Sequence, residues 1–304
     1  CFVHTSNWEV FEVLHERYSL FEVIGRGRGG VVRRGFDHVL KRDAAVKTME
    51  DTPEARREVQ MLGQLQHPRI AGFCDAVIHK GKIHLIMELG RGGTSRQRRL
   101  TLEDLLEVGQ DAAEALSYLH NLGFIHGDVK PSHLVFFDDG RVKLVDFGSS
   151  TTIGDGSLGG TRGYIAPERR RGAPADPRMD VYSLGKTLLA LAKENRIKLP
   201  AHLRIILQKA TAFDPKERFQ DMDEFLEAFQ QETPAKESQP IPYLRGLACA
   251  LFTLAFMFFG VGEEVYPAVF TTFLGPGIVG FCGLYSPLLA LVSLAVVVIP
   301  LFLI

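Results

Sequence analysis

A glycine-rich segment and the lysine and glutamate that follow it have the composition of a phosphate-binding site. Gly25, Gly27 and Gly30 lie between two strand-like runs, and glycine lets backbone N–H groups approach phosphate oxygens closely. Taken alone, these glycines fit an ordinary β-turn equally well. Lys47 follows on the next strand-like run, where its ammonium can reach two phosphates. Glu58 supplies the anion that a lysine in a cleft needs, so the combination favours a phosphate site.

Two further segments bring carboxylates and a lysine together at short spacing. The first runs from His126 through Asp128 to Lys130, and the second is an Asp-Phe-Gly triplet that begins at Asp146. A positioned carboxylate can accept a proton or bind a metal ion. In order and spacing, these segments resemble the catalytic loop and the metal-binding element of eukaryotic-like serine/threonine protein kinases.

Three later motifs extend the resemblance in the family's order. The segment from Gly160 to Glu168 resembles the end of the activation loop. Asp180 resembles the buried aspartate at the start of a central helix, and Arg218 resembles the arginine that pairs with the Glu168-type residue. The resemblance covers residues 18–232. It implies an α+β, two-lobed protein-kinase-like fold, with a small β-rich N-lobe and a larger α-helical C-lobe.

The resemblance also implies a role for each matching side chain in ATP-dependent phosphoryl transfer to serine or threonine hydroxyls of proteins. Lys47 would hold the α- and β-phosphates, and Glu58 would orient Lys47. Asp128 would accept the proton of the substrate hydroxyl, while Lys130 would neutralise charge on the moving phosphoryl group. Asp146 would bind Mg²⁺.

The implied nucleotide site is formed by the glycine-rich segment, the lysine strand and the hinge. Met87 would be the gatekeeper, and Glu88 to Gly90 would receive adenine. The residues expected to contact ATP are Gly25, Gly27, Gly30, Val32, Ala45, Lys47, Met87, Glu88 and Leu89. The expected cofactors are ATP and Mg²⁺, with Mn²⁺ as the alternative metal, and the expected partner is a protein substrate.

Two positions depart from the family pattern. The family's metal-binding asparagine is replaced by His133. Because Mg²⁺ prefers oxygen ligands and imidazole suits softer metals, His133 is expected to weaken the second metal site. The usual catalytic-loop arginine is replaced by Gly127. A phosphorylated activation loop would therefore lack its main cationic partner.

These departures leave two other functions open. His133 favours a pseudokinase that acts as a nucleotide-binding or scaffold module. The sequence His-Gly-Asp, which ends at Asp128, also occurs in aminoglycoside and choline phosphotransferases, which phosphorylate small molecules. That resemblance stops before Glu168, Asp180 and Arg218, which favour a protein kinase.

Apolar periodicity predicts a β-rich half followed by an α-rich half. Short apolar runs suggest an N-terminal antiparallel sheet with strands at Ser19–Ile24, Val31–Phe36, Ala44–Met49, Ala76–His79 and Ile83–Glu88. Helical spacing predicts helices at Pro53–Gln66, Leu102–Leu122, Val181–Lys193, His202–Thr211 and Asp221–Gln231.

Composition constrains the partners and the environment. The net charge of −1 arises from 35 basic and 36 acidic residues, so no global basic surface argues for nucleic acid. Four scattered cysteines suggest neither a disulfide framework nor a zinc site. After an N-terminal extension at 1–17 and the catalytic domain at 18–232, the polar, proline-rich stretch at 233–244 has the character of a linker.

The C-terminal residues 245–304 are nearly free of charge, which predicts a transmembrane region of two or three helices. Lys236 and Arg245 precede the first span, and Glu263 and Glu264 follow it. By the positive-inside tendency, this places the kinase domain on the cytoplasmic face of the membrane. The lipid bilayer is thus an expected partner, and a homodimer formed with a second copy of the chain is a further expected one.

Overall fold

The computed structural model describes residues 10–27, 29–156 and 159–230, and its largest sheet has six strands. Neighbouring strands in this sheet are antiparallel, in the order β1-β2-β3-β4-β6-β5. The strands are β1 (Glu12–Leu14), β2 (Tyr18–Gly27), β3 (Gly30–Asp37), β4 (Arg42–Glu50), β5 (Phe73–His79) and β6 (Lys82–Met87). The predicted N-terminal antiparallel sheet is confirmed. β1 lies within the predicted extension at 1–17 and adds an edge strand that the sequence pattern did not indicate.

The register of the sheet places the expected nucleotide residues on one face. Val32 of β3 lies opposite Lys47 of β4, and Ala45 of β4 lies opposite Met87 of β6. Because side chains two residues apart point to the same face of a strand, these four side chains share one face of the sheet.

The helix between β4 and β5, α1 (Pro53–Leu62), carries Glu58. Thr52 caps its N-terminus by accepting a hydrogen bond from the N–H of Ala55 at 3.2 Å, and Pro53 occupies the first turn, where its missing N–H costs nothing. Met61 and Leu62 are buried in the main core. This packing fixes the helix beside the sheet, so that Glu58 faces β4.

The second half of the described chain is mainly helical. Its helices are α2 (Leu102–Asn121), α3 (Pro167–Arg170), α4 (Pro177–Glu194), α5 (Ala201–Ala210) and α6 (Met222–Gln230). Thr101 and Asp104 form a capping box at the start of α2, and Asp176 caps α4. Gly109 lets α6 approach α2, because a Cβ at Gly109 would lie 2.4 Å from the Phe229 ring.

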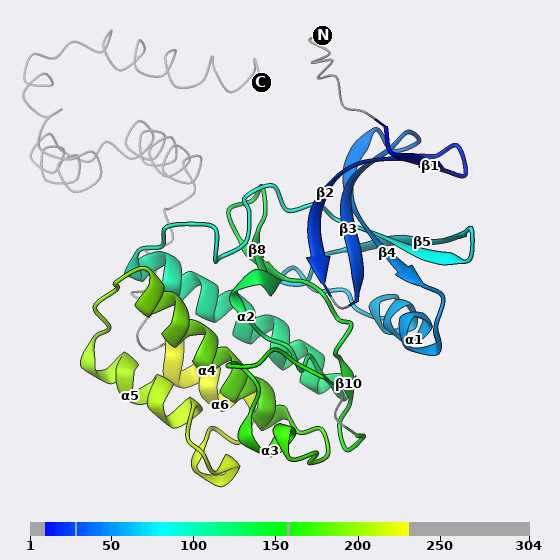
Figure 1. Ribbon diagram of the computed structural model, residues 1–304. Helices are drawn as coiled ribbons and strands as arrows, with labels where there is room; N and C mark the ends of the chain where they lie inside the picture. The colour runs from blue at the N-terminus through cyan, green and yellow to red at the C-terminus, as the bar shows by residue number, and fades with distance from the viewer. Residues whose placement is uncertain (1–9, 28, 157–158, 231–304) are drawn as a thin grey trace, which may run out of the picture. The chain divides into compact units, whose positions relative to one another are not determined.

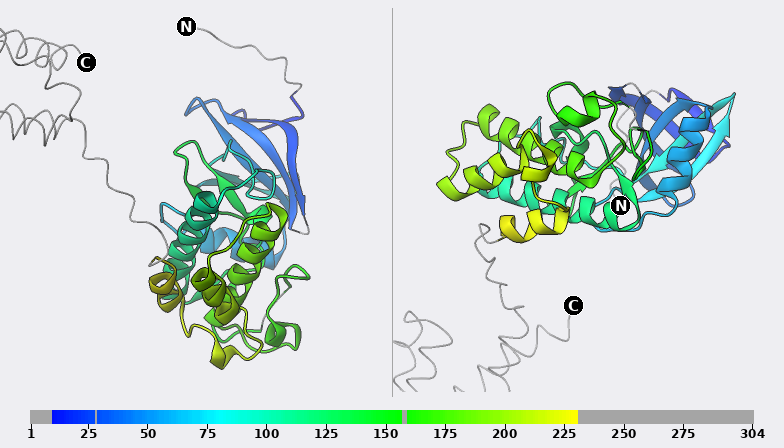
Figure 2. Two further views of the ribbon diagram at one scale, coloured as in Figure 1. Left: turned by 90° about the vertical axis from the view of Figure 1, so that its left-hand side faces the viewer. Right: turned by 90° about the horizontal axis from the view of Figure 1, so that it is seen from below.

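Two lobes result, as the resemblance implied. Figures 1 and 2 show the large sheet and α1 at one end of the domain, with α2, α4, α5 and α6 gathered at the other end. One hydrophobic core contains side chains of both lobes, among them Leu62, Leu85, Leu116 and Phe147. The two-lobed α+β fold is therefore confirmed.

Short elements between the long helices were not predicted, because runs of two to four residues carry no measurable periodicity. They include the paired strands β8 (Leu134–Phe136) and β9 (Val142–Leu144), and the paired strands β7 (Phe124–Ile125) and β10 (Thr151–Thr152). The β8–β9 hairpin carries the chain from the catalytic loop to Asp146. The β7–β10 pair joins the start of the catalytic loop to the segment that follows the Asp-Phe-Gly triplet.

Across residues 10–27, 29–156 and 159–230, no helix has both the length and the apolar character needed to cross a bilayer. The predicted linker at 233–244 and the predicted transmembrane region at 245–304 lie outside the residues that the structure describes.

Candidate active site

Lys47 contacts two carboxylates at once. Its Nζ donates to Glu58 Oε1 at 2.7 Å and to Asp146 Oδ1 at 2.8 Å, with only 4% of the lysine side chain exposed. Burial opposes the charge on Lys47, but the neighbouring Asp146 and Glu58 outweigh it, and the pKa of Lys47 is raised. The lysine is therefore a fixed cation that links the sheet, α1 and the Asp-Phe-Gly segment. This is the pairing with Glu58 that the sequence predicted.

The glycine-rich turn between β2 and β3 lies directly over this cation. A Cβ at Gly29 would be 3.0 Å from Lys47 Nζ, and one at Gly30 would be 2.3 Å from the carbonyl oxygen of Thr48. Gly30 also has a φ of 134°, which L side chains rarely adopt. Glycine is thus required at position 30, where the turn passes the Thr48 carbonyl, and the absence of a side chain at Gly29 leaves room for the Lys47 ammonium. Gly25 pairs with Val32 across the two strands, and Gly27 pairs with Gly30.

The hinge follows β6 and is braced from the C-lobe. The Glu88 carboxylate accepts hydrogen bonds from Lys143 Nζ at 2.7 and 2.8 Å, and the Glu88 N–H donates to the carbonyl of Gly72 at 2.8 Å. Gly90 lies against Val135, since a Cβ there would be 2.5 Å from Val135 Cγ1. Val135 of β8 therefore lies next to the hinge that is expected to receive adenine, a position the sequence analysis did not single out.

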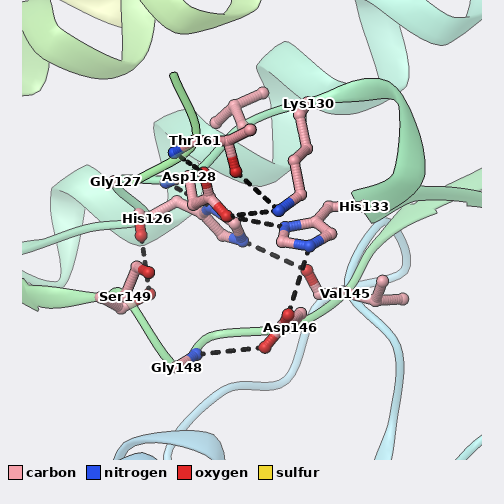
Figure 3. Close-up of polar contacts among 12 residues, drawn as sticks. His126, Gly127, Asp128, Lys130, His133, Val145, Asp146, Gly148, Ser149 and Thr161 are labelled. Carbon is pink, nitrogen blue, oxygen red and sulfur yellow. Dashed lines mark hydrogen bonds and ion pairs between the residues drawn. The ribbon is translucent and has the colours of Figure 1, made fainter. Parts of the chain in front are cut away.

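The carboxylate of Asp128 is held by two donors. Lys130 Nζ donates to Oδ2 at 2.7 Å, and the N–H of Thr161 donates to Oδ1 at 2.6 Å. Burial raises the pKa of Asp128, but the hydrogen bonds from Lys130 and Thr161 outweigh it and the net shift is downward. Lys130 Nζ also donates to Thr161 Oγ1 at 2.8 Å. Figure 3 shows these three side chains converging.

Buried polar contacts fix the backbone of the catalytic loop. Asp180 accepts hydrogen bonds from the N–H groups of His126 at 2.7 Å and Gly127 at 2.8 Å, and His120 Nε2 lies 2.9 Å from its Oδ2. Burial lowers the pKa of His126 to about 4, so its ring is neutral near pH 7. Its Nε2 then donates to the carbonyl of Val145 at 3.2 Å, while its Nδ1 accepts from the Asp128 N–H at 3.3 Å. His126 thus ties the catalytic loop to the residue that directly precedes Asp146.

His133 lies between the two catalytic carboxylates (Figure 3). Its Nε2 is 3.2 Å from Asp146 Oδ2, and its Nδ1 is 3.8 Å from Asp128 Oδ2. Burial opposes the charge of Asp146, but contacts with His133 and Lys47 outweigh it and the pKa of Asp146 falls well below its usual range. Asp146 also has a φ of 62°, in the left-handed region that non-glycine residues seldom occupy.

Asp146 is suited to bind Mg²⁺, because magnesium in proteins is commonly held by one or two carboxylates together with substrate phosphates. At the second position, His133 offers an imidazole nitrogen in place of an amide oxygen. Its Nδ1 is buried and makes no hydrogen bond. Among the described residues, no group of three or more His, Cys, Asp and Glu side chains is placed to hold a metal ion. Asp146 would therefore hold Mg²⁺ as a single carboxylate ligand, whereas the nitrogen of His133 beside it is a poor ligand for Mg²⁺ and would suit a softer metal.

The end of the activation segment is anchored by an ion pair. Arg218 donates through both of its terminal nitrogens to Glu168, at 2.7 and 2.8 Å, and its side chain is fully buried. Removing one partner of a buried pair typically costs about 3–5 kcal/mol, because the other charge is left uncompensated. The Glu168–Arg218 pairing that the resemblance implied is present.

The structure brings together the residues that the sequence selected for chemistry, namely Lys47, Glu58, Asp128, Lys130, His133 and Asp146. It adds residues that the sequence analysis did not place at the site, namely Val135 and Lys143, which both contact the hinge. It also places Thr161 at the site, where its backbone N–H orients Asp128.

Comparisons with known proteins agree with this geometry. The sequence profile of the protein kinase domain matches residues 18–235. A protein of Streptomyces coelicolor named as a probable serine/threonine-protein kinase is 32% identical over 200 residues, and the serine/threonine-protein kinase PknB of Mycobacterium tuberculosis is 34% identical over 200 residues. Sperm motility kinase 3A of Mus musculus is 31% identical over 189 residues.

Each of these matches covers 58% of this chain but only 30%, 32% and 38% of the respective relatives. The chain therefore spans about a third of the length of the curated relatives it matches. Since the profile matches most of the sequence and the lysine, glutamate and aspartates meet as described above, the chain belongs to the protein kinase family.

Proposed function

We propose that this chain catalyses ATP-dependent phosphoryl transfer to serine or threonine hydroxyls of proteins. The observation that carries the proposal is the simultaneous contact of Lys47 with Glu58 and Asp146, beside an Asp128 that is oriented by Lys130 and Thr161. The names of the curated relatives, which are serine/threonine-protein kinases, support the choice of acceptor. Lys130 supports it as well, because a lysine two residues after Asp128 follows the serine/threonine-kinase pattern.

In this reaction the hydroxyl oxygen of the acceptor forms a bond to the γ-phosphorus of ATP. The bond between that phosphorus and the β–γ bridging oxygen breaks, and ADP leaves with the electron pair. Asp128 takes the hydroxyl proton, and Lys130 offsets negative charge on the transferred group. Lys47 holds the phosphates that remain on ADP. A metal ion at Asp146 would supply further charge neutralisation for the phosphates.

Identifying the acceptor tests this proposal. The full chain is incubated with γ-labelled ATP, a generic protein mixture, and separate pools of alcohols and sugars, with Mg²⁺ or Mn²⁺. We expect acid hydrolysis of the labelled protein to release phosphoserine and phosphothreonine. Label that enters only the small molecules would replace this proposal with a small-molecule phosphotransferase.

A second candidate, a pseudokinase that binds nucleotide without transferring phosphate, is favoured by one observation. His133 occupies the space between Asp128 and Asp146 and presents nitrogen where Mg²⁺ prefers oxygen. This candidate predicts ATP binding with no transfer in either metal. In that case the wild-type chain itself would be inactive in phosphoryl transfer.

We also propose that residues 245–304 tether the chain to a membrane, with the kinase domain in the cytoplasm. The support is the nearly charge-free composition of this stretch. Membranes from cells that express the full chain are washed with alkaline carbonate and then with detergent. We expect the chain to stay in the pellet until detergent is added. Release by carbonate alone would rule out a spanning anchor. Cross-linking of the detergent-released chain would separately test the predicted homodimer.

A further inference from the structure

Arg169 is a buried charge that reaches from α3 into the activation segment. Only 5% of its surface is exposed. Its Nε donates to the carbonyl of Gly159 at 3.2 Å, and one terminal nitrogen donates to the carbonyl of Ser149 at 3.2 Å. Ser149 lies just after the Asp-Phe-Gly triplet, whereas Gly159 lies shortly before Thr161. One guanidinium therefore joins two stretches of the activation segment that lie ten positions apart in sequence.

The guanidinium occupies the space beside Gly127 in the catalytic loop. A Cβ at Gly127 would lie 2.2, 2.4 and 2.6 Å from three guanidinium atoms of Arg169, which is closer than real Cβ contacts. Gly127 also has a φ of 77°. A glycine at position 127 and an arginine at position 169 are therefore sterically matched, and any side chain at 127 would have to displace the guanidinium.

The charges around Arg169 explain how an arginine can be buried here. Burial lowers the pKa of Arg169, while the nearby carboxylates of Asp180 and Asp128 favour its charged form. Asp180 binds the catalytic-loop backbone, and Asp128 is the proposed proton acceptor. The cation thus lies near the carboxylates of Asp180 in α4 and Asp128 in the catalytic loop, and it donates to carbonyl oxygens of the activation segment.

We propose that Arg169 is a positioning residue that holds the activation segment against the catalytic loop in the unphosphorylated chain. Among the described residues it donates to two backbone carbonyls, those of Ser149 and Gly159, which are present without any modification, whereas a phosphate must first be added. The segment in turn delivers the Thr161 N–H that orients Asp128. The expected effect of Arg169 on catalysis rests on the proposed phosphoryl transfer. The expected effect of Arg169 on the position of the activation segment does not depend on that function.

Hydrogen exchange of the full chain tests the structural content directly. After phosphatase treatment, wild-type amides in 146–156 and 159–166 are expected to keep their protection. Arg169→Met is expected to speed exchange in both stretches by roughly tenfold, because local opening there no longer breaks the bridging contacts. Amides of α2 are expected to stay unchanged, which separates a local effect from global unfolding. Arg170→Met, which removes an exposed arginine one position away, is the matched control and is expected to have no effect.

Gly127→Ala probes the same contact without changing Arg169, so unchanged protection in this variant would overturn the proposal even if Arg169→Met folds poorly. Its Cβ is expected to displace the guanidinium and to speed exchange in the same two stretches. Because both changes would remove one contact, the double variant is expected to resemble the single variants, whereas independent sites would add. Additive effects in this cycle would overturn the proposal.

Two other results would also overturn it. The first is unchanged protection in Arg169→Met, and the second is loss of protection in phosphatase-treated wild type to the level of that variant.

In phosphoryl transfer, Arg169→Met is expected to lower kcat roughly 10- to 100-fold with little change in the KM for ATP, since the acceptor side of the site is displaced. A wild-type chain that transfers no phosphate would contradict the proposed function, while the exchange data would still decide the part of Arg169.

Discussion

Asp128→Asn is expected to lower kcat for phosphoryl transfer by about 10²–10⁴-fold, the usual contribution of a positioned general base. The amide has nearly the same size as the carboxylate but cannot take the hydroxyl proton. Lys130 would also lose the anion that it contacts at 2.7 Å. Steady-state kinetics of the full chain with a protein acceptor would measure the change.

Binding of ATP provides the control for this variant. Within the described part of the chain, Asp128 makes no hydrogen bond to Lys47 or to the glycine-rich turn, so the dissociation constant for ATP is expected to change little. Asp139→Asn, in the exposed turn between β8 and β9, makes the same chemical substitution away from the site and is expected to leave kcat unchanged. An unchanged kcat in Asp128→Asn would remove Asp128 from the mechanism.

His133→Asn is expected to strengthen the apparent affinity for Mg²⁺ in the transfer assay by roughly tenfold, the scale on which changes around a metal site act. The variant places an amide oxygen between the two carboxylates, where the wild type presents imidazole nitrogen. Magnesium favours the oxygen, whereas manganese tolerates either ligand better. The ratio of the Mn²⁺ rate to the Mg²⁺ rate is therefore expected to fall.

His133→Ala separates a ligand effect from the loss of the histidine itself. Both variants remove the contact between His133 Nε2 and Asp146, but only asparagine supplies an oxygen. Titrating each variant with Mg²⁺ and Mn²⁺ compares them under one set of conditions. Equal changes in the two variants would show that position 133 does not bind the metal in this chain.

The sequence predicted those parts of the fold and the site that depend on long periodic segments and on short motifs. The antiparallel sheet and the helices α1, α2, α4, α5 and α6 follow from apolar spacing, because each buries one face. The ion pair of Lys47 with Glu58 follows from a lysine on a strand and an acid on the next helix. The departure at His133 was also visible in the sequence, and the structure shows that this side chain lies between the carboxylates.

The remaining features depend on how the chain folds back on itself. The contact of the Thr161 N–H with Asp128 is made by backbone, which carries no signal in the type of side chain. Arg169 directly follows a motif glutamate and precedes two further arginines, so nothing in sequence marks it as buried. The space that it fills beside Gly127 becomes evident only when the two positions meet in the structure. A missing side chain at 127 was read as a lost cation, whereas the structure places another cation there.

Transfer of labelled phosphate by the full chain tests the central claim most directly. Wild type and Asp128→Asn are incubated in parallel with γ-labelled ATP and a generic protein acceptor, in Mg²⁺ and in Mn²⁺, and label on the acceptor and on the chain itself is counted. We expect label on serine or threonine in the wild-type reaction, at a level that Asp128→Asn reduces by at least about 100-fold. Wild-type chain that binds ATP but transfers no label in either metal, or transfer that survives Asp128→Asn, would contradict the assignment of this site to phosphoryl transfer.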